Sequence, residues 1–228
     1  QKTPKINIEL RKPINPAWWL VSYPRSGSSF LRALIANYFA GGDEPLSLNQ
    51  ISKLCAGENH EEVWKALTKK STTERSMQEE WNARLGYFQT IRDAKGMNLP
   101  KKLIKSHTIF ASIGGHPSFR FIPDDRIIHV VRHPCDVAIS YAHFSNTSLD
   151  QSIENLNHSG AFHHGAPTLG YSVFGSWVEH TRSWTRKVGA PVFHVPYHVL
   201  TEKTEEVLTA LIRFLDHEPD PALIARAV

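Results

Sequence analysis

The sequence predicts an α/β fold, an open parallel sheet flanked by helices, and two observations lead to that prediction. Four short apolar runs recur along the chain, at about 18–23, 103–104, 127–131 and 192–195, and stretches with helical spacing lie between them. Apolar runs that few polar residues interrupt are typical of parallel strands covered on both faces. Their alternation with helical stretches favours an open sheet with helices on both sides.

The helices are predicted from apolar residues that lie three or four positions apart. After the first strand, Leu31, Leu34 and Ile35 recur at this spacing. Gly41 and Gly42 then end the run. Later helices are expected over about 134–144, 173–187 and 207–215.

Two polar regions interrupt this pattern. The region 42–100, rich in Glu, Lys, Ser and Asn, is expected to be a helical insertion that forms either a wall or lid beside the sheet or plain surface helix. The stretch 146–170 is expected to be a loop, and its histidines lack the carboxylate or cysteine that would complete a typical metal site. The 228 residues are expected to form one domain.

The composition is that of an ordinary globular protein, with 41% hydrophobic and 21% charged residues. No apolar run approaches the roughly 20 residues that span a bilayer, so no membrane span is expected. The net charge of +4 suits an anionic ligand without requiring nucleic acid. Two cysteines without metal-ligand spacing, and first residues without the apolar core of a secretory signal, favour a cytoplasmic protein.

The segment 21–32, VSYPRSGSSFLR, joins the first strand to the first helix through a turn suited to holding an anion. Unpaired N–H groups and the positive dipole end of the helix, serine hydroxyls and the Arg25 guanidinium could converge there on a phosphate or sulfate. The alternative is an ordinary capped helix after a strand, since Ser is a preferred N-cap residue.

Polar residues also follow the other predicted strands. They are Lys105, Ser106 and His107 after the second strand, Arg132 and His133 after the third, and Tyr197 after the fourth. Ligands of open parallel sheets bind beyond the carboxyl ends of the strands, where these residues would meet the first turn. This edge of the sheet is therefore predicted to be an anion site that contains a titratable base.

A site for Mg²⁺-dependent phosphoryl transfer is the obvious competitor. The turn, however, lacks the G-x-x-x-x-G-K-[ST] spacing, and no aspartate ends a neighbouring strand to organise Mg²⁺. Transfer of a sulfuryl group is less demanding, because the group carries less negative charge and can be managed by cationic and hydroxyl side chains. Arg25 and Lys105 suit that task.

Four segments, in order, resemble motifs of the sulfotransferases that use 3′-phosphoadenosine 5′-phosphosulfate (PAPS), of the cytosolic and bacterial type. Segment 23–30, YPRSGSSF, is similar to the family's 5′-phosphosulfate loop, and 131–144, VRHPCDVAISYAHF, to its 3′-phosphate motif. Segment 105–107, KSH, resembles the family's K-T-H, and 175–184 its later G-S-W-x-x-H helix. The resemblance covers about 18–215 and implies a P-loop-like fold, PAPS as co-substrate, adenosine 3′,5′-bisphosphate as product and no metal.

The resemblance also implies roles for individual residues. Around the 5′-phosphosulfate it places Arg25, Ser26, Gly27, Ser28 and Ser29. Around the 3′-phosphate and the adenine it places Arg132, Ser140, Phe30 and Tyr197. Arginine suits bidentate phosphate contact, and Arg25 would neutralise charge on the leaving phosphate. His107 is expected to be the general base that takes the acceptor proton, while Lys105 holds the bridging or sulfuryl oxygens.

The sequence departs from the family pattern at three places. Arg25 stands where cytosolic members commonly have lysine, which keeps the charge but changes how it can contact phosphate. His198 follows Tyr197 where the family usually has glutamate. The family's basic, Gly-rich segment that closes over the 3′-phosphate is not found before Val228, so we expect either that it lies outside this sequence or that PAPS binds weakly.

The prediction is therefore a sulfotransferase that moves a sulfuryl group from PAPS to a hydroxyl or amine of a small-molecule or glycan acceptor. Two alternatives stay open: a P-loop small-molecule or nucleoside kinase, and a nucleotide-binding protein without catalysis. The sequence indicates neither the acceptor nor the oligomeric state.

Overall fold

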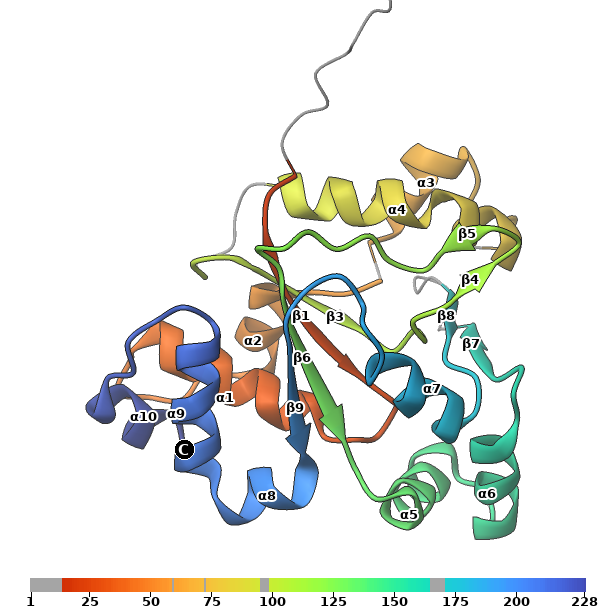
Figure 1. Ribbon diagram of the computed structural model, residues 1–228. Helices are drawn as coiled ribbons and strands as arrows, with labels where there is room; N and C mark the ends of the chain where they lie inside the picture. Colours follow the sequence, from red (N-terminus) through yellow and green to blue (C-terminus); the bar gives the residue numbers. More distant parts are fainter. Residues whose placement is uncertain (1–13, 59, 72, 95–98, 165–170) are drawn as a thin grey trace, which may run out of the picture.

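The computed structural model describes residues 14–58, 60–71, 73–94, 99–164 and 171–228. Parallel strands form its main sheet in the order β2-β3-β1-β6-β9 (Figure 1). Their bounds are Ala17–Ser22 (β1), Cys55–Ala56 (β2), Lys102–Ser106 (β3), Arg126–Val131 (β6) and Val192–Pro196 (β9). The predicted α/β class, an open parallel sheet flanked by helices, is confirmed.

Helices connect and cover these strands. Their bounds are Ser28–Ala40 (α1), Leu48–Leu54 (α2), Glu61–Thr68 (α3), Met77–Asp93 (α4), Pro134–Ser145 (α5), Leu149–Asn157 (α6), Trp177–Trp184 (α7), Tyr197–Glu202 (α8), Thr204–Phe214 (α9) and Pro221–Ala227 (α10). Two short antiparallel pairs complete the described part of the chain, β4 (Ser112–Ile113) with β5 (His116–Pro117) and β7 (Phe162–His164) with β8 (Tyr171–Val173).

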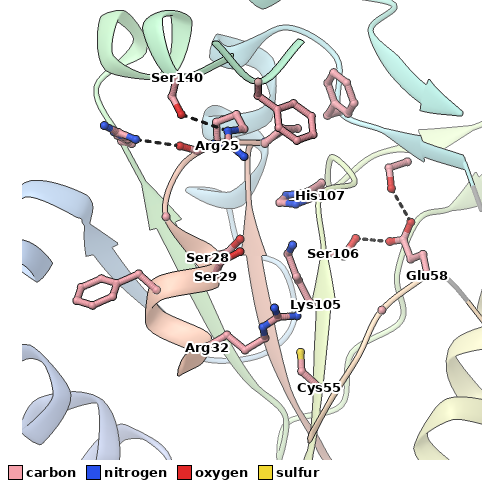
Figure 2. Close-up of a pocket in the computed structure, with 18 of the residues that line it drawn as sticks. Arg25, Ser28, Ser29, Arg32, Cys55, Glu58, Lys105, Ser106, His107 and Ser140 are labelled. Atoms are coloured by element: carbon pink, nitrogen blue, oxygen red, sulfur yellow. Dashed lines mark hydrogen bonds between the residues drawn. The ribbon is translucent and has the colours of Figure 1, made fainter. Parts of the chain in front are cut away.

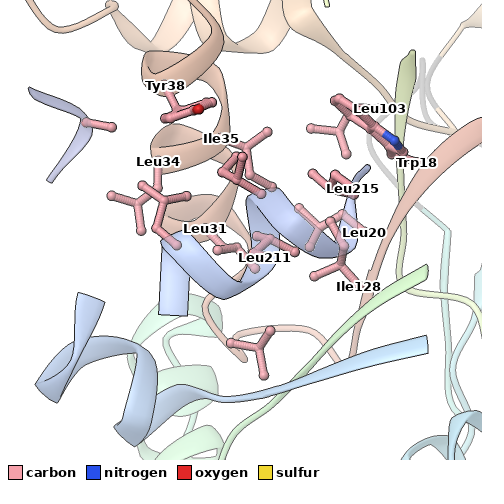
Figure 3. Packing of buried hydrophobic residues seen from close by; sticks show 14 of the residues in the cluster. Trp18, Leu20, Leu31, Leu34, Ile35, Tyr38, Leu103, Ile128, Leu211 and Leu215 are labelled. Atoms are coloured by element: carbon pink, nitrogen blue, oxygen red, sulfur yellow. The ribbon is translucent and has the colours of Figure 1, made fainter. Parts of the chain in front are cut away.

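Each face of the sheet buries its own apolar core, because successive side chains of a strand point to opposite faces. On one face, Trp18 and Leu20 pack against Leu31 in a cluster covered by α1 and α9 (Figure 3). On the other face, Trp19 packs edge-on against Phe88 of α4, with ring centroids 4.9 Å apart. Helices α1, α9 and α10 lie on the face that contains the Trp18 cluster, and α3 and α4 pack with the Trp19 cluster of the other face (Figure 1).

The register of the central strands brings their carboxyl ends together. Val21 of β1 lies opposite Ser106 of β3 on one side and His129 of β6 on the other. The turn that follows β1 is therefore placed between the residues that follow β3 and β6. This is the edge at which the sequence predicts a site.

The region 42–100 contains the expected helices, α2, α3 and α4, but it also contributes a strand that the sequence pattern does not predict. Cys55 and Ala56 form β2, which pairs with Leu103 and Ile104 of β3. A strand of two residues is too short to form an apolar run, so the sequence pattern could not predict it. Its pairing ties this region into the main sheet.

Two other sequence-based predictions were wrong in part. The helix expected over 173–187 is shorter, because Gly175 adopts a positive φ of 60° and Ser176 then caps α7 with a capping box to Glu179. The loop expected over 146–170 contains α6, which Ser148 caps. Within the described residues, no helix combines the length and the apolar character that crossing a bilayer requires.

Candidate active site

A cavity of about 660 Å³ opens at the carboxyl ends of β1, β3 and β6 (Figure 2). All the predicted site residues except Ser26 line it, namely Arg25, Gly27, Ser28, Ser29, Phe30, Lys105, His107, Arg132, Ser140 and Tyr197. Segments far apart in the sequence thus supply one concave surface. A single cavity of this kind is the usual place for a ligand site in an open parallel sheet.

The turn after β1 is shaped by one glycine. Gly27 adopts a φ of 102°, and a Cβ at this position would lie 2.2 Å from Cδ2 of Tyr197. No side chain therefore fits between the turn and that ring, and the glycine lets the chain enter α1 at Ser28. Gly27 has no side chain to cap the helix, so the first N–H groups of α1 are available to an anion in the cavity.

Ser26 does not join the cavity wall. It is almost completely buried, and its N–H donates to the carbonyl of Tyr23 at 3.3 Å, which closes the turn. The hydroxyls of Ser28 and Ser29, by contrast, lie on the side of α1 that faces Lys105 (Figure 2). Of the serines predicted around the 5′-phosphosulfate, these two are the ones placed to contact a ligand.

The predicted 3′-phosphate residues lie together on the α5 side of the cavity. The Arg25 Nε donates to the Ser140 hydroxyl at 3.2 Å, and Arg132 Nη1 donates to the Arg25 carbonyl at 3.3 Å. The guanidinium of Arg132 lies over the Tyr197 ring, 4.6 Å from its centroid, and 4.0 Å from the carboxylate of Asp136. These contacts hold two cations at one wall without fully compensating their charge.

His107 is held in an orientation that suits a base. Its Nδ1 lies 2.7 Å from the carbonyl oxygen of Ser22, which can only accept a hydrogen bond, so the hydrogen of the neutral ring sits on Nδ1. The lone pair is then on Nε2. Behind it, Nε2 of the buried His180 donates to the His107 carbonyl at 3.2 Å and supports the backbone of this turn.

Lys105 lies deeper in the same cavity. Burial lowers the pKa of its ammonium group, the nearby positive charges of Arg32 and Arg25 lower it further, and Cys55 and Glu58 oppose the shift. Burial likewise raises the pKa of the Cys55 thiol to about 11, although Arg32 and Lys105 oppose that rise. This part of the cavity concentrates positive charge in a poorly solvated place, where an anion gains most.

A buried carboxylate that the sequence does not predict forms the β2 side of the cavity. Glu58 pairs with Arg84 of α4 at 2.5 Å, and both side chains are nearly or fully buried. It also accepts hydrogen bonds from Ser106, at a very short distance, and from Ser172 at 3.0 Å. Arg84 in turn donates to the Thr108 hydroxyl at 2.6 Å. Through these hydrogen bonds the pair holds Ser106 and Thr108, the residues on either side of His107, in place.

Among the described residues, no group of three or more His, Cys, Asp or Glu side chains is arranged to hold a metal ion. His158, one of the histidines of the stretch 146–170, is exposed, and its Nδ1 accepts a hydrogen bond from the Gly160 N–H. The polar groups that line the cavity are mainly cations and hydroxyls. Such a donor set suits phosphate and sulfate oxygens rather than a metal ion.

Comparison with known proteins agrees with this geometry. The family model for the sulfotransferase domain matches residues 15–226. The chain belongs to the sulfotransferase family. The family resemblance predicted from the four motifs is therefore confirmed, and the kinase alternative loses its support.

The chain is 24% identical over 224 residues to Sulfotransferase 4A1 of Mus musculus, with 92% of this chain and 63% of that protein covered. It is 23% identical to Sulfotransferase 1E1 of Homo sapiens, with 92% and 62% covered. The chain thus spans less than two thirds of the length of these curated relatives.

Solved structures share the fold. Mouse sulfotransferase SULT7A1, complexed with PAP, superposes with a TM-score of 0.53 at 17% identity, covering 95% of this chain and 63% of that one. Retinol dehydratase, in a complex with retinol and PAP, gives a TM-score of 0.56 at 16% identity, covering 94% and 64%. The P-loop-like sheet and its flanking helices are common to all three proteins.

Proposed function

We propose that this sulfotransferase moves a sulfuryl group from PAPS to a hydroxyl or amine of a small-molecule acceptor. The observation that carries the proposal is the placement of His107 in one cavity with Lys105, the α1 N-terminus and Arg132. A base, a cationic group and a two-part phosphate surface are what sulfuryl transfer between a nucleotide and an acceptor needs. The PAP bound in both structural neighbours supports PAPS as the donor.

In the proposed reaction, Ser28, Ser29 and the first N–H groups of α1 hold the 5′-phosphosulfate. Arg25 and Lys105 balance the charge that develops on the bridging oxygen. The acceptor oxygen or nitrogen attacks sulfur in line, and the bond between sulfur and the 5′-phosphate oxygen breaks. The acceptor proton passes to Nε2 of His107, and adenosine 3′,5′-bisphosphate leaves.

Arg132 and Ser140 are proposed to hold the 3′-phosphate, while Phe30 and Tyr197 contact the adenine. Phe30 is 39% exposed at the rim of the cavity, and Tyr197 closes over Gly27. An exposed aromatic ring beside a phosphate surface suits stacking on a base. Small-molecule acceptors are favoured over glycans because retinol and androsterone occupy one neighbouring fold, retinol dehydratase.

The test has two measurements. Calorimetry with adenosine 3′,5′-bisphosphate should show binding, and transfer of labelled sulfate from PAPS should be detected with at least one member of a panel of phenols, alcohols, steroids, amines, glycans and peptides. Binding without transfer to any member would favour a nucleotide-binding protein without catalysis. Consumption of ATP with Mg²⁺, and no response to PAPS, would favour a kinase.

A further inference from the structure

The cavity continues past the phosphate surface to a part that the proposed reaction does not use. This part, here called the cavity floor, is lined by the half-buried Arg32 of α1, the exposed Ser52 of α2 and the buried Cys55 of β2. Figure 2 shows the Arg32 guanidinium between Lys105 and Cys55, on the far side of Lys105 from His107. The floor therefore adjoins the proposed site of transfer.

Arg32 brings a positive charge to the floor without a matching negative one. Among the described residues it forms no ion pair, and its Nε is buried without a hydrogen-bond partner. Glu58 is the carboxylate of the cavity wall, and Arg84 already pairs with it. Two neighbouring cations in a poorly solvated place are unfavourable unless an anion joins them.

The proposed donor has other partners for its charges. Its 5′-phosphosulfate would meet Arg25, Lys105 and the α1 N-terminus, and its 3′-phosphate would meet Arg132. Arg32 lies one helical turn after Ser28, roughly 6 Å along α1 from the first N–H groups of the helix, and on the far side of Lys105 from His107. A second anion, which enters with the acceptor, is the simplest partner for it.

We propose that Arg32 is the anion-binding residue of the acceptor site and that the preferred acceptors are hydroxylated aromatic acids. The inference rests on the proposed function. The acceptor hydroxyl would lie at His107 while its carboxylate meets Arg32, with Lys105 between them. Aromatic side chains, Phe144 and Phe174, also line this cavity and suit a ring-bearing acceptor.

The proposal is tested by comparing an acid with its neutral amide. With the protein saturated with adenosine 3′,5′-bisphosphate, calorimetry measures the affinity for 3-(4-hydroxyphenyl)propionate and for 3-(4-hydroxyphenyl)propionamide. The acid should bind at least about tenfold more tightly, as expected when one charge-assisted contact is lost in the amide. With PAPS present, kcat/KM for sulfate transfer should favour the acid by a similar factor.

Variants then assign the preference to one side chain. Arg32→Gln should bring the two ligands to equal affinity while the affinity for adenosine 3′,5′-bisphosphate stays within about twofold. Arg32→Lys, which keeps the charge, should retain part of the preference. Arg213→Gln, which removes an exposed arginine at the end of α9, is the matched control and should leave the preference unchanged.

Three results would overturn the proposal. Equal affinity of the wild-type protein for acid and amide would do so without any variant. A tenfold loss of nucleotide affinity in Arg32→Gln would assign Arg32 to the donor instead. If the protein binds the nucleotide and sulfates the amide as well as the acid, the acceptor inference alone fails; if it binds no nucleotide, the proposed function fails with it.

Discussion

On the α5 side of the cavity the polar side chains make few contacts with one another, whereas on the β2 side they form a buried network. Among the described residues, Arg25 and Arg132 reach a serine hydroxyl, a backbone carbonyl and, at 4.0 Å, the carboxylate of Asp136. Glu58, by contrast, is paired with Arg84 and accepts hydrogen bonds from neighbouring hydroxyls. The two walls differ in how well their charges are satisfied before any ligand binds.

This difference separates two tasks. Cations with long, partly exposed contacts can exchange these contacts for a ligand phosphate at little cost. A buried ion pair holds its neighbours in place, because breaking it leaves an uncompensated charge in a poorly solvated site. His107 lies where the two walls meet, and the Ser22 carbonyl orients its ring. The α5 side with Arg25 and Arg132, here called the open wall, is thus suited to binding. The β2 side with Glu58 and Arg84, here called the closed wall, is suited to positioning.

The largest effect is expected at the residue between the walls. His107→Ala should lower kcat for sulfate transfer by about 10²–10⁴-fold, because a positioned base contributes that much. The affinity for adenosine 3′,5′-bisphosphate should change less than about threefold, since the base faces the acceptor. His158→Ala, at an exposed histidine, is the control and should keep full activity. Equal activity of His107→Ala and this control would remove the base from the mechanism.

The closed wall is tested by Glu58→Gln, which keeps the shape of the side chain but leaves Arg84 without its counter-charge. Breaking a buried pair in this way should lower the free energy of unfolding by about 3–5 kcal/mol. Chemical denaturation measures the loss. Asp43→Asn, at a pair with Arg226 whose carboxylate side chain is 92% exposed, should change stability little. Similar losses in both variants would mean that the β2 wall is no more rigidly held than the surface.

The open wall is tested by Arg132→Ala. Loss of a charge-assisted contact of about 1.5–3 kcal/mol should weaken binding of adenosine 3′,5′-bisphosphate by roughly 10–100-fold. Binding of adenosine 5′-phosphate, which lacks the 3′-phosphate, should change by less than about threefold. Stability should stay near that of the wild type, because this wall contributes few satisfied contacts. Equal losses for both nucleotides would assign the arginine another task.

The open wall could be predicted from the sequence because its residues follow strands that are recognisable as apolar runs. Burial on both faces makes β1 and β6 continuous apolar runs, so the positions at their carboxyl ends, among them Arg25 and Arg132, can be read along the chain. The order of the motifs then indicates that they share one edge of the sheet. The structure confirms that they line one cavity.

The closed wall could not be predicted in the same way. Glu58 follows β2, a strand of two residues that is defined by its pairing with β3 rather than by its own pattern. Its partner Arg84 lies on a helix that packs against the other face of the sheet, and no local spacing joins the two. Arg32 has helical spacing like its neighbours, and its place in the cavity depends on how α1 packs against β1 and α2. Such contacts arise from tertiary packing alone.

A pH effect concerns His180 and His129, the buried histidines behind His107, and it sharpens the contrast with the exposed cations of the open wall. Burial lowers the pKa of His180 to about 3, with the nearby His107 adding to the shift, and burial likewise lowers the pKa of His129 to about 3. In the unfolded chain each has its ordinary pKa of about 6.5. Between these values the unfolded state binds more protons, so the free energy of unfolding falls as the pH decreases from 6.5 toward 3.

Each of these two histidines should contribute a slope of about 1.4 kcal/mol per pH unit well below pH 6.5. Denaturation curves at pH 7.5, 6.0 and 5.0 measure it. His129→Gln, which cannot bind a proton, should flatten the dependence by the share of one histidine, whereas His158→Gln, at an exposed position, should leave it unchanged. A stability that does not change between pH 7.5 and 5.0 would mean that water or a counter-charge reaches these rings, and the layer behind His107 would then be as open as the wall that faces the nucleotide.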